Sequence, residues 1–251
     1  MRIAVAGGTG TVGRHVVETA RGRGHEVVVL SRSVGVDVLT GQGLDAGLRG
    51  ADAVIDTVNA TTLSTRKAVA FFERSTTQLL DAGARAGTGH HVTLSIVGID
   101  GIDTSYYAGK LAQERLVAAS AVPHTIARTS QFHEFAQQIA RQTTLGPLTI
   151  VPKTLTRPVA AREVAEHLVM IAEGAPRGRV TDLIGPRDEV LADMVRRMYA
   201  ERGIRRRVLE MRFPGAYGRG LASGALRGDG SAETATIGFD EWLRARPLAE
   251  S

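Results

Sequence analysis

The sequence predicts an α/β fold, in which a doubly wound parallel sheet is flanked by helices and joined by a smaller C-terminal lobe. Short β-branched runs alternate with longer helical patterns through the first half of the chain. Several of these runs are almost wholly apolar, which is typical of strands buried on both faces. A glycine-rich turn follows the first run directly and opens a helix. Together these observations favour parallel strands joined by crossover helices.

The strands of the first half are predicted at residues 2–6, 26–30, 53–57, 91–97 and 124–128. Between the third and fourth, apolar residues around Phe72 and Leu79 recur at helical spacing, and Gly83 and Gly87 are candidate C-caps.

The second half predicts a helix over 161–173, a strand over 179–184 and a further helix that carries Leu191 and Met194. Residues 215–231 are rich in Gly, Ala and Ser, which indicates a mobile loop rather than a packed element. Residues 239–243 then have the spacing of a short docking helix, with Trp242 as an apolar anchor.

Composition excludes several classes of protein. The 251 residues include no cysteine, so disulfides and cysteine-ligated metals are ruled out, and the histidines lack the spacing of metal ligands. No apolar run approaches the roughly 20 residues of a membrane helix, and we expect a cytoplasmic protein. The net charge is +5, but the arginines are dispersed and aromatic residues are scarce, so no nucleic-acid partner is expected.

The glycine turn over residues 7–13 satisfies the pattern G-x-G-x-x-G between a strand and a helix. Its glycines permit a tight turn, a close approach of backbone to a pyrophosphate, and close contact between helix and strand. The free N–H groups at the start of the helix favour an anion. The turn therefore predicts a nicotinamide-dinucleotide site of the Rossmann type, with contacts from Gly7, Thr9, Gly10, Thr11, Val12 and Gly13.

The end of the second strand distinguishes the two nicotinamide cofactors. An NAD site usually has an acidic residue there, which binds the ribose 2′-hydroxyl. This chain has Ser31-Arg32-Ser33 instead. The Arg32 guanidinium suits a 2′-phosphate, and the hydroxyls of Ser31 and Ser33 can add hydrogen bonds. NADP(H) is therefore predicted, with NAD(H) as the alternative if Arg32 is only a solvated surface residue.

A Y-x-x-x-K pair, Tyr106 and Lys110, lies at the start of the helix after the fourth strand. Spacing i, i+4 puts both side chains on one helical face, where the ammonium is expected to lower the pKa of the phenol. Tyr106 would then donate a proton to a carbonyl, and Ser95 at the end of the fourth strand would hydrogen-bond the same oxygen. The alternative is that Lys110 merely forms a surface pair with Glu114.

In these residues the chain resembles the NmrA-like branch of the atypical short-chain dehydrogenase/reductases. The resemblance spans nearly the whole chain and includes further segments at 36–38, 58–59, 95–98, 125–128, 162–165 and 239–243. It implies that Asp37 and Val38 contact adenine, that Val58 and Asn59 lie beside the adenine ribose, and that Lys110 holds the nicotinamide ribose.

The resemblance also implies a domain organisation, with an NAD(P)-binding Rossmann domain over 1–150. Residues 151–251 would be a substrate-covering lobe that returns a strand and a helix to the core. Gln131, Phe132 and His133 would line the substrate pocket. The chain departs from the pattern at Ala127-Arg128-Thr129, where relatives often have Arg-Pro, and Tyr107 with Lys110 satisfies the variant Y-x-x-K.

The sequence thus favours an NADPH-dependent oxidoreductase that reduces a small carbonyl or quinone-like substrate by hydride transfer. Members of the branch also include NADP(H)-binding redox sensors that perform no chemistry, and this is the first alternative. An epimerase or dehydratase with tightly held NAD is the second. The oligomeric state and the identity of the substrate are left open.

Overall fold

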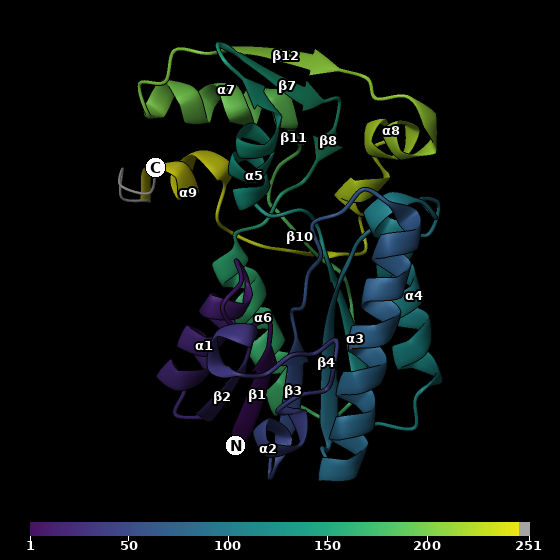
Figure 1. Ribbon diagram of the computed structural model, residues 1–251. Helices are drawn as coiled ribbons and strands as arrows, with labels where there is room; N and C mark the ends of the chain where they lie inside the picture. The colour runs from purple at the N-terminus through teal and green to yellow at the C-terminus, as the bar shows by residue number, and fades with distance from the viewer. Residues whose placement is uncertain (246–251) are drawn as a thin grey trace. The chain divides into compact units, whose positions relative to one another are not determined.

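The computed structural model of the protein describes residues 1–245 (Figure 1). The chain divides into two compact units that are each discontinuous in sequence. Unit 1 comprises residues 1–95, 103–128 and 164–181, and unit 2 comprises residues 96–102, 129–163 and 182–251. The predicted domains, 1–150 and 151–251, are continuous segments, and their division into a cofactor-binding domain and a substrate-covering lobe stays a prediction.

The strands of unit 1 form a parallel sheet in the order β5-β4-β3-β1-β2, with β9 paired to β5. Their bounds are β1 Arg2–Ala6, β2 Glu26–Leu30, β3 Ala53–Asp56, β4 His90–Ile96, β5 His124–Thr129 and β9 Gly178–Arg179. Because β2 and β3 lie on opposite sides of β1, the strand order reverses at β1. The predicted α/β class with a parallel sheet is confirmed, and the five predicted strands are all present.

Helices cover both faces of this sheet (Figure 1). Helices α1 and α6 lie on one side of the strands, and α3 and α4 lie side by side on the other. The bounds are α1 Gly13–Gly22, α2 Leu44–Leu48, α3 Thr65–Ala86, α4 Ser105–Ala119 and α6 Ala161–Glu173, with a short 3₁₀ turn, η1, at Arg32–Val34. Helix α3 ends at Gly87, whose φ of 70° is favourable for glycine, whereas Gly83 lies inside the helix.

A glycine sets the spacing between α3 and α4. A Cβ atom on Gly109 would lie 2.6 Å from Cδ2 of Phe72 and 2.9 Å from the carbonyl oxygen of Ala68. The two helices therefore pack closely at the turn of α4 that carries Lys110.

Unit 2 contains a second sheet, of order β12-β7-β6, in which β12 is parallel and β6 antiparallel to β7. In this unit, β10 pairs with Thr129 and with β13, and β11 pairs with β8. The bounds are α5 Glu134–Thr143, β6 Thr144–Leu145, β7 Leu148–Pro152, β8 Leu155–Thr156, β10 Leu183–Ile184, β11 Glu189–Val190, α7 Leu191–Glu201, β12 Arg207–Met211, α8 Gly215–Ala222, η2 Ala225–Arg227, β13 Glu233–Thr234 and α9 Phe239–Ala245.

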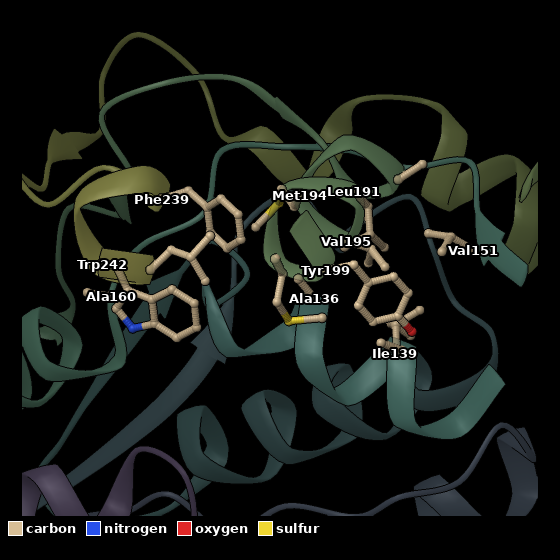
Figure 2. Close-up of a cluster of buried hydrophobic side chains, with 14 residues drawn as sticks. Ala136, Ile139, Val151, Ala160, Leu191, Met194, Val195, Tyr199, Phe239 and Trp242 are labelled. Atoms are coloured by element: carbon tan, nitrogen blue, oxygen red, sulfur yellow. The ribbon is translucent and has the colours of Figure 1, made fainter. Parts of the chain in front are cut away.

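The core of unit 2 gathers α5, α7 and α9 around a buried apolar cluster (Figure 2). The Phe239 and Trp242 rings of α9 stack with centroids 5.5 Å apart, so the predicted docking helix and its apolar anchor are confirmed. The Tyr199 hydroxyl reaches Oγ1 of Thr149 at 2.8 Å, which satisfies the polar end of a buried ring.

Two predictions in the second half were wrong. Residues 215–231 contain α8 and η2, with Leu221 and Leu226 buried, instead of an unpacked loop. The glycines that suggested a loop permit close packing here, since a Cβ on Gly218 would lie 1.8 Å from the Phe213 carbonyl oxygen. The single strand predicted over 179–184 is two short strands, β9 and β10, because the first pairs with Thr125 and Ile126 and the second with Thr129.

Candidate functional site

The glycine turn lies at the carboxyl edge of the sheet in unit 1. The register aligns Ala6 of β1 with Leu30 of β2 and with Asp56 of β3, so the segments that follow these three strands meet at one edge. Ligands of open α/β sheets bind outside this edge, where the strand order reverses. The predicted cofactor segments after β1, β2 and β3 are therefore brought together.

Hydrogen bonds within the backbone fix the turn. Gly7 N donates to Leu30 O at 3.1 Å, and Gly10 N donates to Gly7 O at 2.9 Å. Thr9, Gly10 and Thr11 are exposed at its tip, whereas Val12 and Gly13 are buried. The tip therefore presents backbone to solvent at the start of α1, where the helix dipole favours an anion.

Two of the glycines are required by close contacts. A Cβ on Gly13 would lie 2.1 Å from Gly7 O, and a Cβ on Gly7 would lie 2.9 Å from Thr57 O. Gly7 also has a φ of 73°, which L side chains rarely adopt. The contacts of Gly13 provide the close helix–strand approach, and those of Gly7 bring the turn against the end of β3.

The segment after β2 holds the three residues that are predicted to bind a 2′-phosphate, and that contact stays a prediction. Arg32 is exposed and makes no ion pair with residues 1–245. Ser31 and Ser33 flank it, and their hydroxyl oxygens lie 2.8 Å apart. A guanidinium without an internal partner and two adjacent hydroxyls form a donor set that suits a phosphate monoester.

The residues predicted to contact the adenosine lie in or near a buried apolar cluster that includes Leu30, Leu44 and Val58. Val58 is buried in that cluster and Val38 packs against it from the loop after η1. The carboxylate of Asp37 accepts from Leu39 N at 2.8 Å, which holds the loop in place. Asn59 is exposed directly after Val58. Their contacts with a nucleotide stay predictions.

Tyr106 lies in the first turn of α4, and its ring packs against Phe72 and Tyr107 with centroids 5.7 and 5.8 Å apart. Burial raises the pKa of the phenol. This corrects the expectation that the Lys110 ammonium lowers the pKa of Tyr106, because desolvation of the phenolate is the dominant influence. Tyr106 therefore keeps its proton at neutral pH.

Lys110 is a buried residue, with 3% of its surface exposed. Its Nζ donates to Leu94 O at 2.6 Å and to Oε1 of Gln113, and it lies 4.8 Å from the centroid of the Phe72 ring. Burial lowers the pKa of Lys110 to about 8. In this structure the ammonium is directed to groups of its own unit.

The alternative of a Lys110–Glu114 surface pair is wrong. The Glu114 carboxylate instead accepts two hydrogen bonds from Arg128 of β5, at 2.8 and 2.7 Å. Both side chains are largely buried, at 12% and 4% exposure, and Lys110 is itself buried.

Ser95 is the last residue of β4 that belongs to unit 1. Its Oγ is buried and has no hydrogen-bond partner among the described residues. Six other buried Ser and Thr hydroxyls of the described residues share this feature, so a contact of Ser95 with a substrate oxygen stays a prediction. Ser105, the first residue of α4, has a φ of 55°, so the backbone is strained next to Tyr106.

Gln131, Phe132 and His133 lie in unit 2, at the entry to α5. His133 is 1% exposed, its Nε2 lies 2.9 Å from Ile237 O, and its ring packs against Phe239 and Trp242. Burial lowers the pKa of His133, so the imidazole is neutral. The structure therefore gives His133 a packing role, and a substrate contact of these three residues stays a prediction.

The sequence reasoning missed Asp56 and Gln113. Both are buried, and Gln113 Nε2 donates to Asp56 Oδ2 at 2.8 Å. An acidic residue that ends an otherwise apolar strand was the one signal in the sequence, whereas nothing marked Gln113 on its helix.

The described residues hold neither a cluster of metal ligands nor a membrane-spanning helix. Residues 1–245 contain no group of three or more metal-ligating side chains placed to hold an ion. None of the helices in that range is long and apolar enough to cross a membrane.

Comparison with known proteins agrees with this geometry. Residues 3–126 match the model of the NAD dependent epimerase/dehydratase family. The mouse (Mus musculus) epimerase family protein SDR39U1 is 46% identical over 57 residues, which are 22% of this chain and one fifth (20%) of the length of that relative.

Solved structures share the fold over almost the whole chain. MoeE5 in complex with UDP-glucuronic acid and NAD has a TM-score of 0.73 at 18% identity, covering 98% of this chain and 97% of that chain. NADPH-dependent quinone oxidoreductase QOR2 from Escherichia coli, complexed with NADPH, has a TM-score of 0.71 at 16% identity, covering 96% and 98%. At these identities the likeness shows the fold, and the family model matches the part of the chain that holds the glycine turn and α4.

Proposed function

We propose that this protein is an NADPH-dependent oxidoreductase that reduces a small carbonyl or quinone-like substrate by hydride transfer. The choice of cofactor rests on Arg32, which follows the end of β2 between two serine residues. Its guanidinium is exposed and makes no ion pair within residues 1–245. The fold shared with the E. coli quinone oxidoreductase supports the reaction class. The NmrA-like branch, a cytoplasmic location and a small-molecule partner belong to the same proposal.

The residues present fit a nicotinamide dinucleotide. The exposed tip of the glycine turn would bind the pyrophosphate through backbone N–H groups, and the contact between Gly13 and Gly7 O leaves no room for a side chain there. Arg32, with Ser31 and Ser33, would bind the 2′-phosphate, and Asp37, Val38, Val58 and Asn59 would surround the adenosine. Lys110 would hold the nicotinamide ribose.

NADPH, when bound there, would provide the hydride for the substrate carbon. The chain then has to supply a proton to the substrate oxygen, and Tyr106 Oη is the donor that we assign to this step. Its pKa is raised, so the phenol carries the proton before reaction. The orphaned Ser95 Oγ would hydrogen-bond the same oxygen. Gln131, Phe132 and His133 would line the substrate pocket.

The test is turnover of NADPH with a panel of small carbonyls and quinones, followed at 340 nm. We expect substrate-dependent oxidation with at least one member, and an at least tenfold lower rate at equal NADH concentration. Absence of turnover across the panel, with NADPH bound, would remove the reductase from consideration.

A redox sensor that binds NADP(H) without turnover is the second candidate. It is favoured by the raised pKa of Tyr106 and by the hydrogen bonds that direct Lys110 to Leu94 O and Gln113. A sensor is expected to bind NADPH and NADP⁺ with clearly different affinities and to leave the whole panel unreduced. Equal affinities together with turnover would exclude it.

The family match favours an epimerase or dehydratase that retains NAD. Such an enzyme would release stoichiometric NAD on denaturation, and its cofactor preference would not change in an Arg32→Ala variant. Protein purified without bound nucleotide would count against this third candidate.

A further inference from the structure

A buried polar network joins the end of β3 to α4 within unit 1. Asp56, Gln113 and Lys110 are 1%, 0% and 3% exposed. Gln113 Nε2 donates to Asp56 Oδ2 at 2.8 Å, and Gln113 Oε1 accepts from Lys110 Nζ. Lys110 Nζ also donates to Leu94 O at 2.6 Å. One amide therefore connects a buried carboxylate with a buried ammonium.

A glutamine is suited to the middle of this network. An ionised carboxylate only accepts hydrogen bonds and an ammonium only donates them, so the residue between them must offer both a donor and an acceptor. Gln113 presents Nε2 to the carboxylate of Asp56 and Oε1 to Lys110. A methionine at this position would break both links, and an ionised glutamate would have no donor for Asp56.

The second oxygen of the same carboxylate holds the backbone that packs against the glycine turn. Asp56 Oδ1 accepts from Val58 N at 2.9 Å, and this fixes the backbone that follows β3. The same backbone forms the wall behind the turn, because a Cβ on Gly7 would lie 2.9 Å from Thr57 O and 3.1 Å from Val58 N. Asp56 is thus bonded both to the wall of the predicted pyrophosphate site and, through Gln113, to Lys110.

The charges around Lys110 make Asp56 its principal counter-charge. The carboxylates that act on Lys110 are Asp56 from β3 and Glu114 from α4. Glu114 is paired with Arg128 of β5, so its charge is already balanced. From α3 the neighbour is the uncharged Phe72 ring, which also contacts Tyr106. Asp56 has no arginine partner of this kind among the described residues.

We infer that Asp56 and Gln113 are positioning residues, which set both the place and the charge of Lys110 relative to the glycine turn. The inference rests on the proposed function, in which Lys110 holds the nicotinamide ribose beside Tyr106. Asp56 favours the charged ammonium, whereas burial lowers the pKa of Lys110 to about 8. Burial likewise raises the pKa of Asp56, and the Lys110 ammonium opposes that rise, so each group favours the charged form of the other. Near neutral pH, removal of Asp56 therefore changes the protonation of Lys110 as well as its position.

The experiment uses the small number of lysines in the chain, which are Lys67, Lys110 and Lys153. Protein labelled with ¹³C-lysine is titrated by NMR, and the Lys110 signal is assigned by its loss in Lys110→Met. We expect Asp56→Asn to lower the Lys110 midpoint by about one pH unit, a tenfold change in its protonation constant. Gln113→Glu, which places a carboxylate beside Nζ, is expected to raise the midpoint.

The matched control is Thr76→Val on α3. Thr76 is fully buried in the same unit, and its Oγ1 makes no hydrogen bond within the described chain, so the change removes a buried hydroxyl that has no part in the network. Its Lys110 midpoint is expected to equal that of the wild type. If Asp56→Asn does not fold, Gln113→Met interrupts the same link and is also expected to lower the titration midpoint of Lys110.

The outcomes separate this inference from the proposed function. Opposite midpoint shifts in Asp56→Asn and Gln113→Glu, with the alkaline limb of turnover moving in the same directions, support both. The same opposite shifts in a protein without turnover support the network and overturn the reductase. Unchanged midpoints in the folded variants, or equal shifts in Thr76→Val, overturn the network even in an active enzyme.

Discussion

A substitution at Gly13 tests whether the glycine turn is packed as the structure describes. In Gly13→Ala the new Cβ would lie 2.1 Å from Gly7 O and 2.8 Å from Gly8 Cα. Ordinary contacts are about 3.5 Å, so the turn must open by roughly 1.4 Å. The atoms in the way belong to the backbone, and Gly7 O also accepts the bond from Gly10 N that closes the turn. Overpacking of this kind costs about 1–3 kcal/mol in the free energy of unfolding.

The same helix offers a matched control. Gly22 is an exposed residue at the other end of α1, and a Cβ there would meet nothing within 4 Å. Gly22→Ala is expected to raise the free energy of unfolding by up to about 1 kcal/mol, because alanine loses less backbone entropy in a helix. Both variants replace glycine with alanine, but the expected changes in the free energy of unfolding are opposite in sign.

The assay is urea denaturation of both variants, with NADPH affinity measured by fluorescence titration. We expect Gly13→Ala to be the less stable and to bind NADPH at least tenfold more weakly, because the N–H groups of the turn are displaced. Gly22→Ala should bind as the wild type does. Equal stabilities for the two variants, or an unchanged NADPH affinity in Gly13→Ala, would refute the packing of the turn.

Three further predictions concern α4 and its partners. Tyr106→Phe is expected to reduce turnover at least a hundredfold with little change in NADPH affinity, since it removes the proton donor alone. Steady-state kinetics measure this effect, and wild-type rates would exclude Tyr106 from the reaction. Glu114→Gln is expected to lower the free energy of unfolding by about 1.5–3 kcal/mol, because the buried Arg128 would lose the charge-assisted hydrogen bonds that it donates to the Glu114 carboxylate. A loss below about 1 kcal/mol by denaturation would contradict a buried pair. The pKa of Lys110 is lowered to about 8 from its ordinary 10.5, so between these values the unfolded state binds more protons and stability should rise with pH relative to Lys110→Met. A difference between those two proteins that is flat or falls across this window would show that Lys110 is not buried as described.

The strands and the cofactor edge were predictable because each has a local signature. The apolar runs that became β1 and β2 and the glycines at 7, 10 and 13 are contiguous in sequence, and parallel strands necessarily bring their carboxyl ends together. Arg32 could be placed because it directly follows a strand. These inferences needed no knowledge of contacts between distant residues.

What failed depended on contacts that sequence spacing does not reveal. The pKa of Tyr106 is set by burial against Phe72, a residue 34 positions earlier, and not by its i+4 neighbour. Glu114 pairs across to β5 instead of along its own helix. Gly218 permits close packing against Phe213, so a segment that reads as a loop forms a helix. Each of these features depends on contacts between residues that are distant in sequence, and local propensity does not reveal such contacts.

Calorimetric titration of the wild type and Arg32→Ala with NADPH and NADH measures whether Arg32 sets the preference of the cofactor site for NADP(H). Charge-assisted hydrogen bonds to a phosphate are worth about 1.5–3 kcal/mol, or about 10- to 100-fold in affinity. We expect the wild type to prefer NADPH by at least this lower factor. We also expect Arg32→Ala to lose the preference while its affinity for NADH is unchanged. Equal affinities in the wild type, or a preference that persists without Arg32, would contradict this role of Arg32.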